Sequence, residues 1–375
     1  MTQTWAIFKD AYRELNARKM FWISIAIAVL VVLTFAIFGM DEKGVQILWW
    51  DIPTEIFNTT VFPKETLYKF LFATVGLGLW LGWASTILAL VSTASVIPDF
   101  VASGAIENML ARPISRTRLF LTKYVASLLF VVLQALVFTL LSVIIIGFRS
   151  GEWLWSLLYA VPAVTLFYSY LYSVAALVGV WTRSTLASLV AALLLWGSIF
   201  AVAFVHNNIV LQAKLSAEDP IPLERANLVA LRAQVEKLPP DFATPEEAGE
   251  ARRLKESLVR KETALAEREK SAETWNSWFR FTYLAHAILP KTGETKDMMV
   301  RWSDPNGDIS RFVDAMGSGG RNQDGPVRGP SRRIQRQMEQ VLRQQNTPWY
   351  VFGTSLAFEA IVLGAACVIF ARRDF

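Results

Sequence analysis

Residues 21–40 read FWISIAIAVLVVLTFAIFGM, a run without one charged side chain. An α-helix rises about 1.5 Å per residue and the hydrocarbon core of a bilayer is about 30 Å thick, so about twenty apolar residues cross it. The run is longer than the apolar core of a secretory signal peptide, and no small-residue cleavage motif follows it before Asp41. We therefore expect a retained transmembrane helix.

Five further apolar blocks are long enough to cross a bilayer, at residues 70–97, 124–148, 154–180, 186–205 and 349–370. In the chain as a whole, 53% of the residues are hydrophobic and 18% are charged. Backbone amides in hydrocarbon must be paired within their own segment, so these blocks are expected to be helices rather than the alternating strands of a barrel. The predicted fold class is an all-α, polytopic membrane protein with six transmembrane helices and a large, mostly helical extracytoplasmic insert between helices five and six.

The short connections between the blocks differ in basic charge. If the N-terminus is cytoplasmic, most of the Lys and Arg residues in these connections lie inside, and the outer side carries only Lys43, Lys64, Lys69 and Arg149. Positive charge concentrates on the cytoplasmic side of membrane proteins, so both termini are predicted to be cytoplasmic. The insert at 207–347 is too long to obey this rule, and its placement outside the membrane rests on the number of spans alone.

Residue types that carry most enzymatic chemistry are scarce. The chain has one Cys and two His, His206 and His286, and neither His has a Cys or an acid at metal-ligand spacing. No Gly-rich phosphate loop ending in Gly-Lys-Ser/Thr is present, so this chain is not expected to hydrolyse ATP. We predict no catalytic, cofactor-binding or metal-binding residue. Basic residues beside apolar blocks account for most of the net charge of +5, which argues against nucleic acid as a partner.

The polar insert contains two helical patterns on either side of Pro239 and Pro240. Apolar residues at coiled-coil spacing precede the prolines, at Leu228, Leu231, Val235 and Leu238. A capping box from Thr244 to Glu247, with Pro245 at the first helical position, opens a second, charged helix. The pattern favours a helical hairpin; the alternative is two separately solvated helices, because few apolar positions support the pairing.

Three shorter features complete the insert. The Gly-rich stretch 316–330 is expected to be flexible, and Ser331 is predicted to cap a polar helix that ends near Gln345. The sequence Asp304-Pro305-Asn306-Gly307-Asp308 begins like a calcium-binding loop, but Ile309 and Ala315 stand where such a loop requires Gly and Glu. A β-turn is therefore favoured over a calcium site.

Residues 98–124 read PDFVASGAIENMLARPISRTRLFLTKY and connect the second and third spans on the predicted cytoplasmic side. Cap residues, a short apolar face and a terminating proline predict a helix of about three turns, on Asp99, Ser103, Ile106, Met109, Leu110 and Pro113. The same spacing fits a solvated connector whose basic residues anchor the bundle, and the spacing does not decide between the two.

This connection resembles that of the type-2, export-type permeases of ATP-binding-cassette (ABC) transporters, on Gly104, Ile106, Glu107, Leu110, Pro113, Ile114, Ser115, Arg116, Leu119 and Lys123. The final residues 370–375, FARRDF, are also similar to the ends of many members. The resemblance covers the six spans and this loop. It implies that the loop contains a coupling helix, which docks into a groove of a separate cytoplasmic ATPase subunit. The implied ATPase-coupling residues are Asp99, Gly104, Ile106, Glu107, Leu110, Arg112, Pro113 and Arg116, with Glu107, Arg112 and Arg116 as polar contacts.

The resemblance implies a function as well. The chain would be a transmembrane permease subunit that couples ATP hydrolysis by the ATPase to export of an unidentified substrate, with ATP and Mg on the ATPase and no cofactor here. A second permease chain, as homodimer or heterodimer, and the lipid bilayer would be further partners, and the bacterial inner membrane the expected location. The insert at 207–347 departs from the family's short outer connection, so a mechanotransmission or scaffold subunit that drives an envelope protein without moving a substrate is the alternative.

Glu359 is the only formal charge well inside a predicted span. An unpaired charge at that depth costs at least about 2.5 kcal/mol, so the carboxyl group must face a cavity, find a partner or be neutral. It is either a pathway-lining or intramembrane polar site, or a hydrogen-bonded carboxyl between packed helices.

The predicted organisation has four parts. An amphipathic cytoplasmic helix occupies 1–19, with Trp5, Phe8, Tyr12 and Leu15 on one stripe. In the similar family such a helix lies beside the ATPase, and an ordinary cytoplasmic helix is the alternative. Spans one to five and the coupling loop at 98–123 occupy 20–206, the insert with its flexible stretch 316–330 occupies 207–347, and the sixth span with a basic tail occupies 348–375.

Overall fold

The computed structural model describes residues 19–54, 57–102, 115–238, 245–304, 306–318 and 332–373. Contacts divide the chain into two compact units, and each is described by itself. The first, the bundle unit, contains residues 1–199, 289–325 and 348–375, and the second, the hairpin unit, contains 200–288 and 326–347. The predicted insert is therefore divided between the units, because its described residues 289–304 and 306–318 belong to the bundle unit and 207–238 and 245–288 to the hairpin unit.

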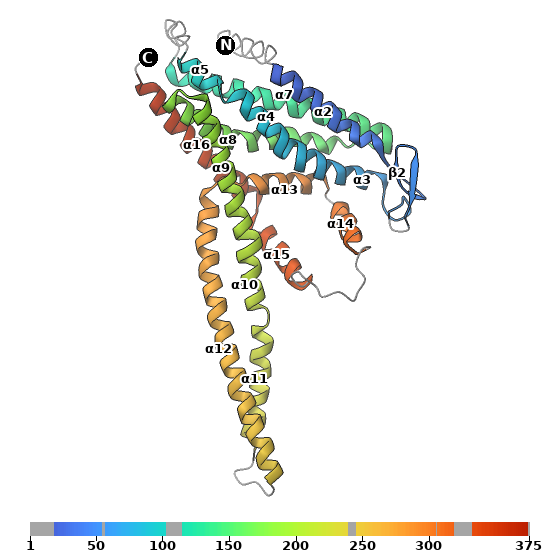
Figure 1. Cartoon of the computed structure of the whole chain (residues 1–375), viewed down its shortest axis with the longest axis vertical. Helices are drawn as coiled ribbons and strands as arrows, with labels where there is room; N and C mark the ends of the chain where they lie inside the picture. The colour runs from blue at the N-terminus through green and yellow to red at the C-terminus, as the bar shows by residue number, and fades with distance from the viewer. Residues whose placement is uncertain are drawn as a thin grey trace. The chain divides into compact units, whose positions relative to one another are not determined.

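Among the described residues, six helices are long and apolar enough to cross a membrane, as the sequence predicts. They are α2 (Lys19–Ile37); the continuous α3 (Lys64–Leu71), η1 (Phe72–Ala84), α4 (Ser85–Thr93) and α5 (Val96–Ala102); α7 (Arg116–Ser150); η2 (Trp155–Tyr159) with α8 (Ala160–Thr182); α9 (Thr185–Phe204); and α16 (Pro348–Arg372). Figure 1 shows α2, α4 and α7 lying side by side in the bundle unit. Aromatic side chains fill its core, with Phe138 against both Phe35 and Phe72.

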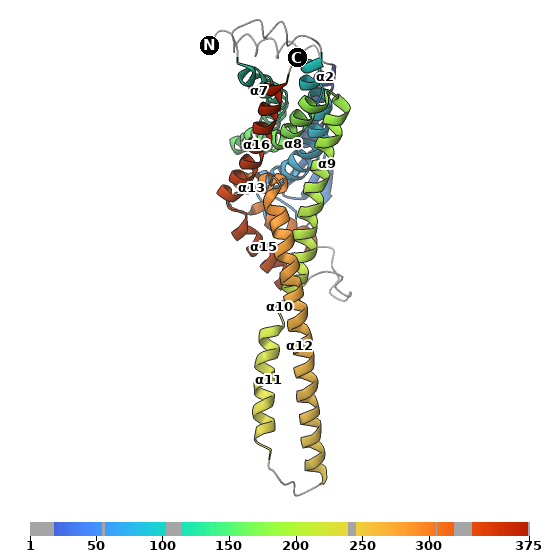
Figure 2. The same cartoon turned by 90° about the vertical axis from the view of Figure 1, so that its left-hand side faces the viewer.

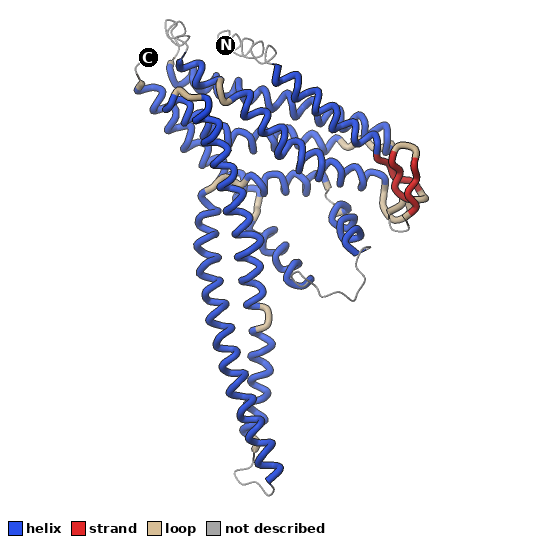
Figure 3. The backbone as a smooth tube through the Cα atoms, in the orientation of Figure 1, coloured by secondary structure: helices blue, strands red, loops and turns tan. Residues whose placement is uncertain are grey.

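A small antiparallel sheet follows the first span, so the all-α prediction is incomplete. Strands β1 (Phe38–Asp41), β2 (Gly44–Ile47) and β3 (Trp50–Pro53) pair in the order β1-β2-β3, shown in red in Figure 3. Gly44 makes the first turn possible: its φ is +143°, and a Cβ atom there would lie 2.2 Å from the carbonyl oxygen of Ile52. Four-residue strands are too short for a period-2 pattern to be recognised in the sequence.

Two short helices of the predicted insert belong to the bundle unit. Helix α13 (Thr292–Ser303) contacts α8, α16, η1 and η2. Helix α14 (Asp308–Ser318) packs on α3, where Phe312 is buried among the rings of Phe57, Phe62 and Phe70. The scattered aromatic residues that hold α14 lie more than 240 positions before Phe312 in the chain, so no local pattern reveals this packing.

The turn before α14 matches the predicted β-turn. Gly307 has a φ of +70°, and its N–H donates to the carbonyl oxygen of Asp304 at 3.2 Å. The Asp304 carboxylate accepts from the N–H groups of Asp308 and Ile309 at the start of the helix. Asp304 is therefore a helix cap, and the described residues contain no group of three side chains able to hold a metal ion.

The hairpin unit is built from the end of α9, η3 (Val205–Val210), α10 (Leu211–Glu218), α11 (Ile221–Glu236), α12 (Pro245–Ile288) and α15 (Arg332–Gln345). Helices α10 and α11 run antiparallel along α12, as Figures 1 and 2 show. Leu228 and Leu231 are buried in this pairing, and ion pairs join the two sides, Arg225 to Glu269, Arg232 to Glu262 and Arg268 to Glu224. The hairpin is thus formed, and the two helices do not lie separately.

Helix α15 packs on α10 within the same unit. The Asp219 carboxylate, at the end of α10, pairs with the Arg333 guanidinium at 3.1 Å and accepts from the Gln337 amide at 3.3 Å. The helix ends at Gln345, as predicted from the sequence. The predicted cap Ser331, the connection 239–244 and most of the Gly-rich stretch lie outside the described residues.

Candidate functional site

The predicted coupling loop is described only at its two ends. Asp99 lies exposed on α5, and Arg116 is the half-buried first residue of α7. Residues 1–18 of the amphipathic helix predicted at 1–19 lie outside the described residues. So do six of the predicted coupling residues: Gly104, Ile106, Glu107, Leu110, Arg112 and Pro113. The described part of the site therefore consists of the helix ends that this loop joins.

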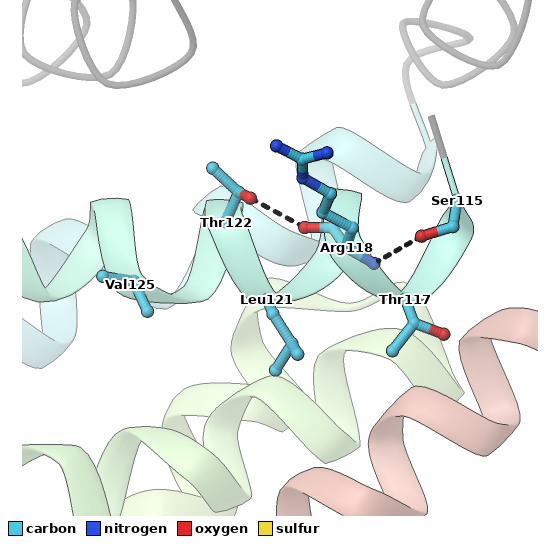
Figure 4. Close-up of a pocket in the computed structure, with 6 residues that line it drawn as sticks. All are labelled: Ser115, Thr117, Arg118, Leu121, Thr122 and Val125. Atoms are coloured by element: carbon cyan, nitrogen blue, oxygen red, sulfur yellow. Dashed lines mark hydrogen bonds between the residues drawn. The ribbon is translucent and has the colours of Figure 1, made fainter. Parts of the chain in front are cut away.

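Helix α7 begins with a defined cap. The hydroxyl of Ser115 accepts from the backbone N–H of Arg118 at 3.4 Å, which satisfies one of the free N–H groups of the first turn. An open pocket of about 440 Å³ lies along this turn. In Figure 4, Thr117, Leu121 and Val125 project from one side of the helix, as their four-residue spacing requires, and Arg118 projects from another. The helix start that follows the loop is thus capped and accessible.

The side chain of Arg116 joins the start of α7 to the end of α16. Its Nη1 group donates to the carbonyl oxygens of Ala371 at 3.2 Å and Arg373 at 2.8 Å. The last carbonyl groups of a helix have no partner within the helix and carry its negative dipole end, so a guanidinium is a favourable partner there. The resemblance implies an ATPase contact for Arg116; the structure places one of its nitrogens on the chain's own backbone.

A second arginine continues this connection to the end of α8. The Nη1 group of Arg373 donates to the carbonyl oxygens of Val180 and Trp181, the latter at 3.1 Å. The helix ends at Thr182, and the next residue, Arg183, has a φ of +56°, the left-handed conformation typical of a helix end. We call Arg116, Arg373 and these carbonyl groups the arginine clamp. The clamp connects the start of α7 to the end of α16, and the end of α16 to the end of α8.

Glu359 lies among the same three helices. Its carboxyl group accepts from the hydroxyl of Tyr124 on α7 at 2.8 Å and from the hydroxyl of Ser169 on α8 at 2.9 Å, and the residue is 9% exposed. Each hydroxyl also lies close to a backbone carbonyl oxygen. The Tyr124 hydroxyl is 2.9 Å from the carbonyl oxygen of Ser169, and the Ser169 hydroxyl is 2.9 Å from the carbonyl oxygen of Leu166. This geometry is that of a hydrogen-bonded carboxyl between packed helices. A pathway-lining role for Glu359 stays a prediction.

Hydroxylated side chains extend this polar contact towards the second span. The ring of Tyr172 stacks on Tyr124 and Tyr168, and the hydroxyls of Tyr168 and Tyr172 contact the side chain and the carbonyl oxygen of Thr93 on α4. Sequence reasoning missed these partners. The available signal was the run YSYLYS at 168–173 inside an apolar span, because hydroxyl groups in hydrocarbon require partners.

Residues 14–198 match the family model of the ABC-2 family transporter protein. The chain carries an ABC-2 transporter domain. The match confirms the resemblance to type-2 ABC permeases and, with the six apolar helices, identifies a multi-pass membrane protein. No curated protein and no solved structure matches the chain significantly. ABC-2 permeases are normally non-catalytic membrane subunits that work with a partner ATPase.

The ABC-2 domain ends where the hairpin unit begins. The match stops at residue 198, and the boundary between the two units falls between Ile199 and Phe200. The matched segment contains the predicted coupling loop, Tyr124, Ser169 and Arg116, whereas Glu359, Arg373 and the whole hairpin unit lie beyond it. Both polar connections therefore join the ABC-2 domain to the sixth span.

Beyond the ABC-2 domain, Lys291 is a buried base at the start of α13, with 1% of its surface exposed. Its ammonium donates to the carbonyl oxygen of Leu289 and faces the ring of Tyr350, and its backbone N–H donates to the hydroxyl of Ser355 on α16. Burial lowers the pKa of Lys291 to about 8, although the nearby Glu294 opposes this shift. The folded chain therefore binds fewer protons here than the unfolded chain between pH 8 and about 10.4.

Because of this shift, Lys291→Met is expected to be more stable than the wild type at pH 7, where folding must bury the charged amine. The difference should narrow as the pH rises through the window from about 8 to about 10.4, since the amine is then neutral in the folded state. Apparent melting temperatures of both proteins in detergent at pH 7 and pH 9.5 measure it. Lys255→Met, at an exposed position of α12, should show no such trend; equal trends in both variants would refute the assignment.

Proposed function

We propose that this chain is the permease subunit of an ABC exporter and couples ATP hydrolysis on a separate cytoplasmic ATPase to movement of its own spans. The observation that carries the proposal is the ABC-2 match over residues 14–198, which includes the loop at 98–123. ATP and Mg bind the ATPase, and no nucleotide site is proposed on this chain. The complex contains two permease chains and two ATPase subunits, in a bacterial inner membrane with both termini in the cytoplasm.

The arginine clamp supports a route for this coupling. The loop at 103–114 leads directly into Ser115 and Arg116, and Arg116 donates to the last carbonyl groups of the α16 segment. Arg373, at the end of that segment, donates to the last carbonyl groups of α8. A displacement of the loop by the ATPase therefore moves the ends of α7, α16 and α8 together.

The Glu359 contact supports the same route deeper in the bundle. Tyr124, Ser169 and Glu359 hydrogen-bond the three helices to one another again. Helices joined at two levels move as one body, so closure of the ATPase dimer shifts the population between two packings of the permease pair. The substrate then passes between the two permease chains.

The test is co-purification from gently solubilised membranes. The wild-type chain should retain an ATPase subunit, and Glu107→Arg should lose it at least tenfold, because a reversed charge in a docking contact costs about 1.4 kcal/mol or more. The matched control is Glu152→Arg, an exposed acid just after the opposite end of α7, which should retain the ATPase. A wild-type chain that carries no ATPase and is active without one would overturn the proposal.

A mechanotransmission subunit is the second candidate, and the hairpin unit favours it. Helix α12 has 44 residues and is therefore about 66 Å long. Such a hairpin is suited to contact an envelope protein. The conformational change of the ATPase would then be transmitted to that protein, and no substrate would be moved. Stimulation of the ATPase by an envelope protein, but by no small solute, would decide for this candidate; stimulation by a transported solute would decide for export.

A further inference from the structure

The exposed face of α12 changes from charged to apolar towards its C-terminal end. Before residue 274 it carries charged side chains, among them Glu267, Lys270 and Glu273. The last eleven residues, 278–288, contain one formal charge, Arg280. Four large apolar side chains at spacings of three and four form a stripe there, with exposed fractions of 53% for Trp278, 65% for Phe281, 63% for Leu284 and 72% for Ile288.

The neighbouring helix in the hairpin unit exposes apolar side chains at the same level. The ring of His206 on η3 lies 4.9 Å from that of Phe279 and 5.3 Å from that of His286, and its Nδ1 atom is 2.9 Å from the hydroxyl of Thr282. The end of α12 is thus paired with the end of the fifth span. Phe200, Phe204 and Ile209 are 55%, 49% and 46% exposed on that helix.

Helix length places this pairing at the membrane surface. The fifth span begins at Thr185, and twenty residues, about 30 Å of helix, end at Phe204. His206 therefore lies at the edge of the hydrocarbon core. Because α12 runs antiparallel to the span and Thr282 lies opposite His206, Ile288 lies about 9 Å deeper and Trp278 about 6 Å further out.

We propose that residues 278–288 of α12 are inserted in the lipid leaflet that surrounds the end of the fifth span. Phe281, Leu284 and Ile288 contact acyl chains, and Trp278 and Arg280 lie at the headgroup level, where amphipathic and long basic side chains are favoured. A surface pocket of about 500 Å³, lined by Thr274, Ser277, Trp278 and Phe281, lies where the charged face gives way to the apolar one.

The apolar stripe is suited to contact lipid. The stripe continues the exposed apolar surface of a membrane-spanning helix, and its depth agrees with the depth counted along that helix. The base of the hairpin is therefore inserted in the bilayer. Part of the insert at 207–347, which the sequence predicts to lie wholly outside the membrane, is buried in lipid. This inference depends on the membrane topology and not on the proposed transport function.

Single cysteines in the full chain test the inference. In a Cys367→Ser background reconstituted in nanodiscs, F281C, L284C and I288C carry a spin label, and E267C on the same helix is the aqueous control. Labels at 284 and 288, below the edge of the hydrocarbon core, should collide with oxygen and be protected from a water-soluble nickel chelate at least tenfold better than the label at 267, and the label at 281, at that edge, should be protected to an intermediate degree. Equal access of the chelate at 288 and 267 would place the stripe in water, and protection of 288 from both reagents would show a covering protein; either result overturns the proposal.

Discussion

The double variant Tyr124→Phe/Ser169→Ala is expected to destabilise the membrane bundle much more than the single variant Glu359→Leu. The double variant leaves a buried carboxyl group without either hydroxyl donor, at a cost of about 3 kcal/mol or more. In Glu359→Leu both hydroxyls keep their carbonyl acceptors, the oxygens of Ser169 and Leu166, so the cost should be about 1 kcal/mol. Removing the donors is thus worse than removing the acceptor.

Apparent melting temperatures in detergent measure this difference. The triple variant, which adds Glu359→Leu to the double variant, should recover most of the lost stability because no carboxyl group is then left unpaired. Tyr159→Phe/Ser198→Ala makes the same chemical changes at exposed positions and should have little effect. A triple variant no more stable than the double one would show that the three side chains do not form one hydrogen-bonded unit.

Removal of the arginine clamp by Arg116→Ala/Arg373→Ala is expected to separate ATPase binding from movement of the spans. The variant loses charge-assisted hydrogen bonds from α7 to the end of α16 and from there to α8. Each such bond is worth about 1.5–3 kcal/mol, so the response of α16 to nucleotide should fall at least tenfold. ATPase association should persist, because the proposed docking contact lies in the loop at 98–123 and not in the arginine clamp.

The response can be followed at Cys367, the single cysteine of the chain, which is half-buried on α16. Its labelling rate in the assembled complex should change when a non-hydrolysable ATP analogue is added, and this change should be lost in the clamp variant. Arg118→Ala/Arg372→Ala removes the same charge from neighbouring exposed positions and should keep the response. A clamp variant that responds like the wild type would exclude this route of coupling.

Much of the fold is readable in the sequence because the bilayer imposes simple constraints. Long apolar blocks such as 21–40 predict the six spans, and each block is helical over most of its length in the structure. The heptad-like Leu228 and Leu231 predict the hairpin, and Gly307 marks the turn before α14. The strands at 38–53 were missed because four-residue strands show no recognisable period.

The candidate site was predicted only in part. Glu359 is conspicuous as a charge within a span, and Arg116 belongs to a loop with a family resemblance. Their partners are distant: Tyr124 lies 235 positions before Glu359, and Arg373 lies 193 positions after Val180. A serine or a helix-terminal carbonyl has no property in the sequence that assigns it to a particular partner.

The sequence by itself determined that this is a polytopic helical membrane protein with a long helical hairpin after its fifth span, and its residues 14–198 match the ABC-2 family. The length of an apolar block, the helical period and the turn residues are local properties of the sequence. Because apolar surface must be buried in lipid or in a helix pair, a segment with these properties can adopt few structures other than a helix. Only the tertiary structure decided that α7, α8 and α16 are joined by the arginine clamp and by Glu359, and that α13 and α14 pack with the spans. Those contacts join residues far apart in the chain, and hydrogen bonds of this kind depend on atomic distances that packing alone sets.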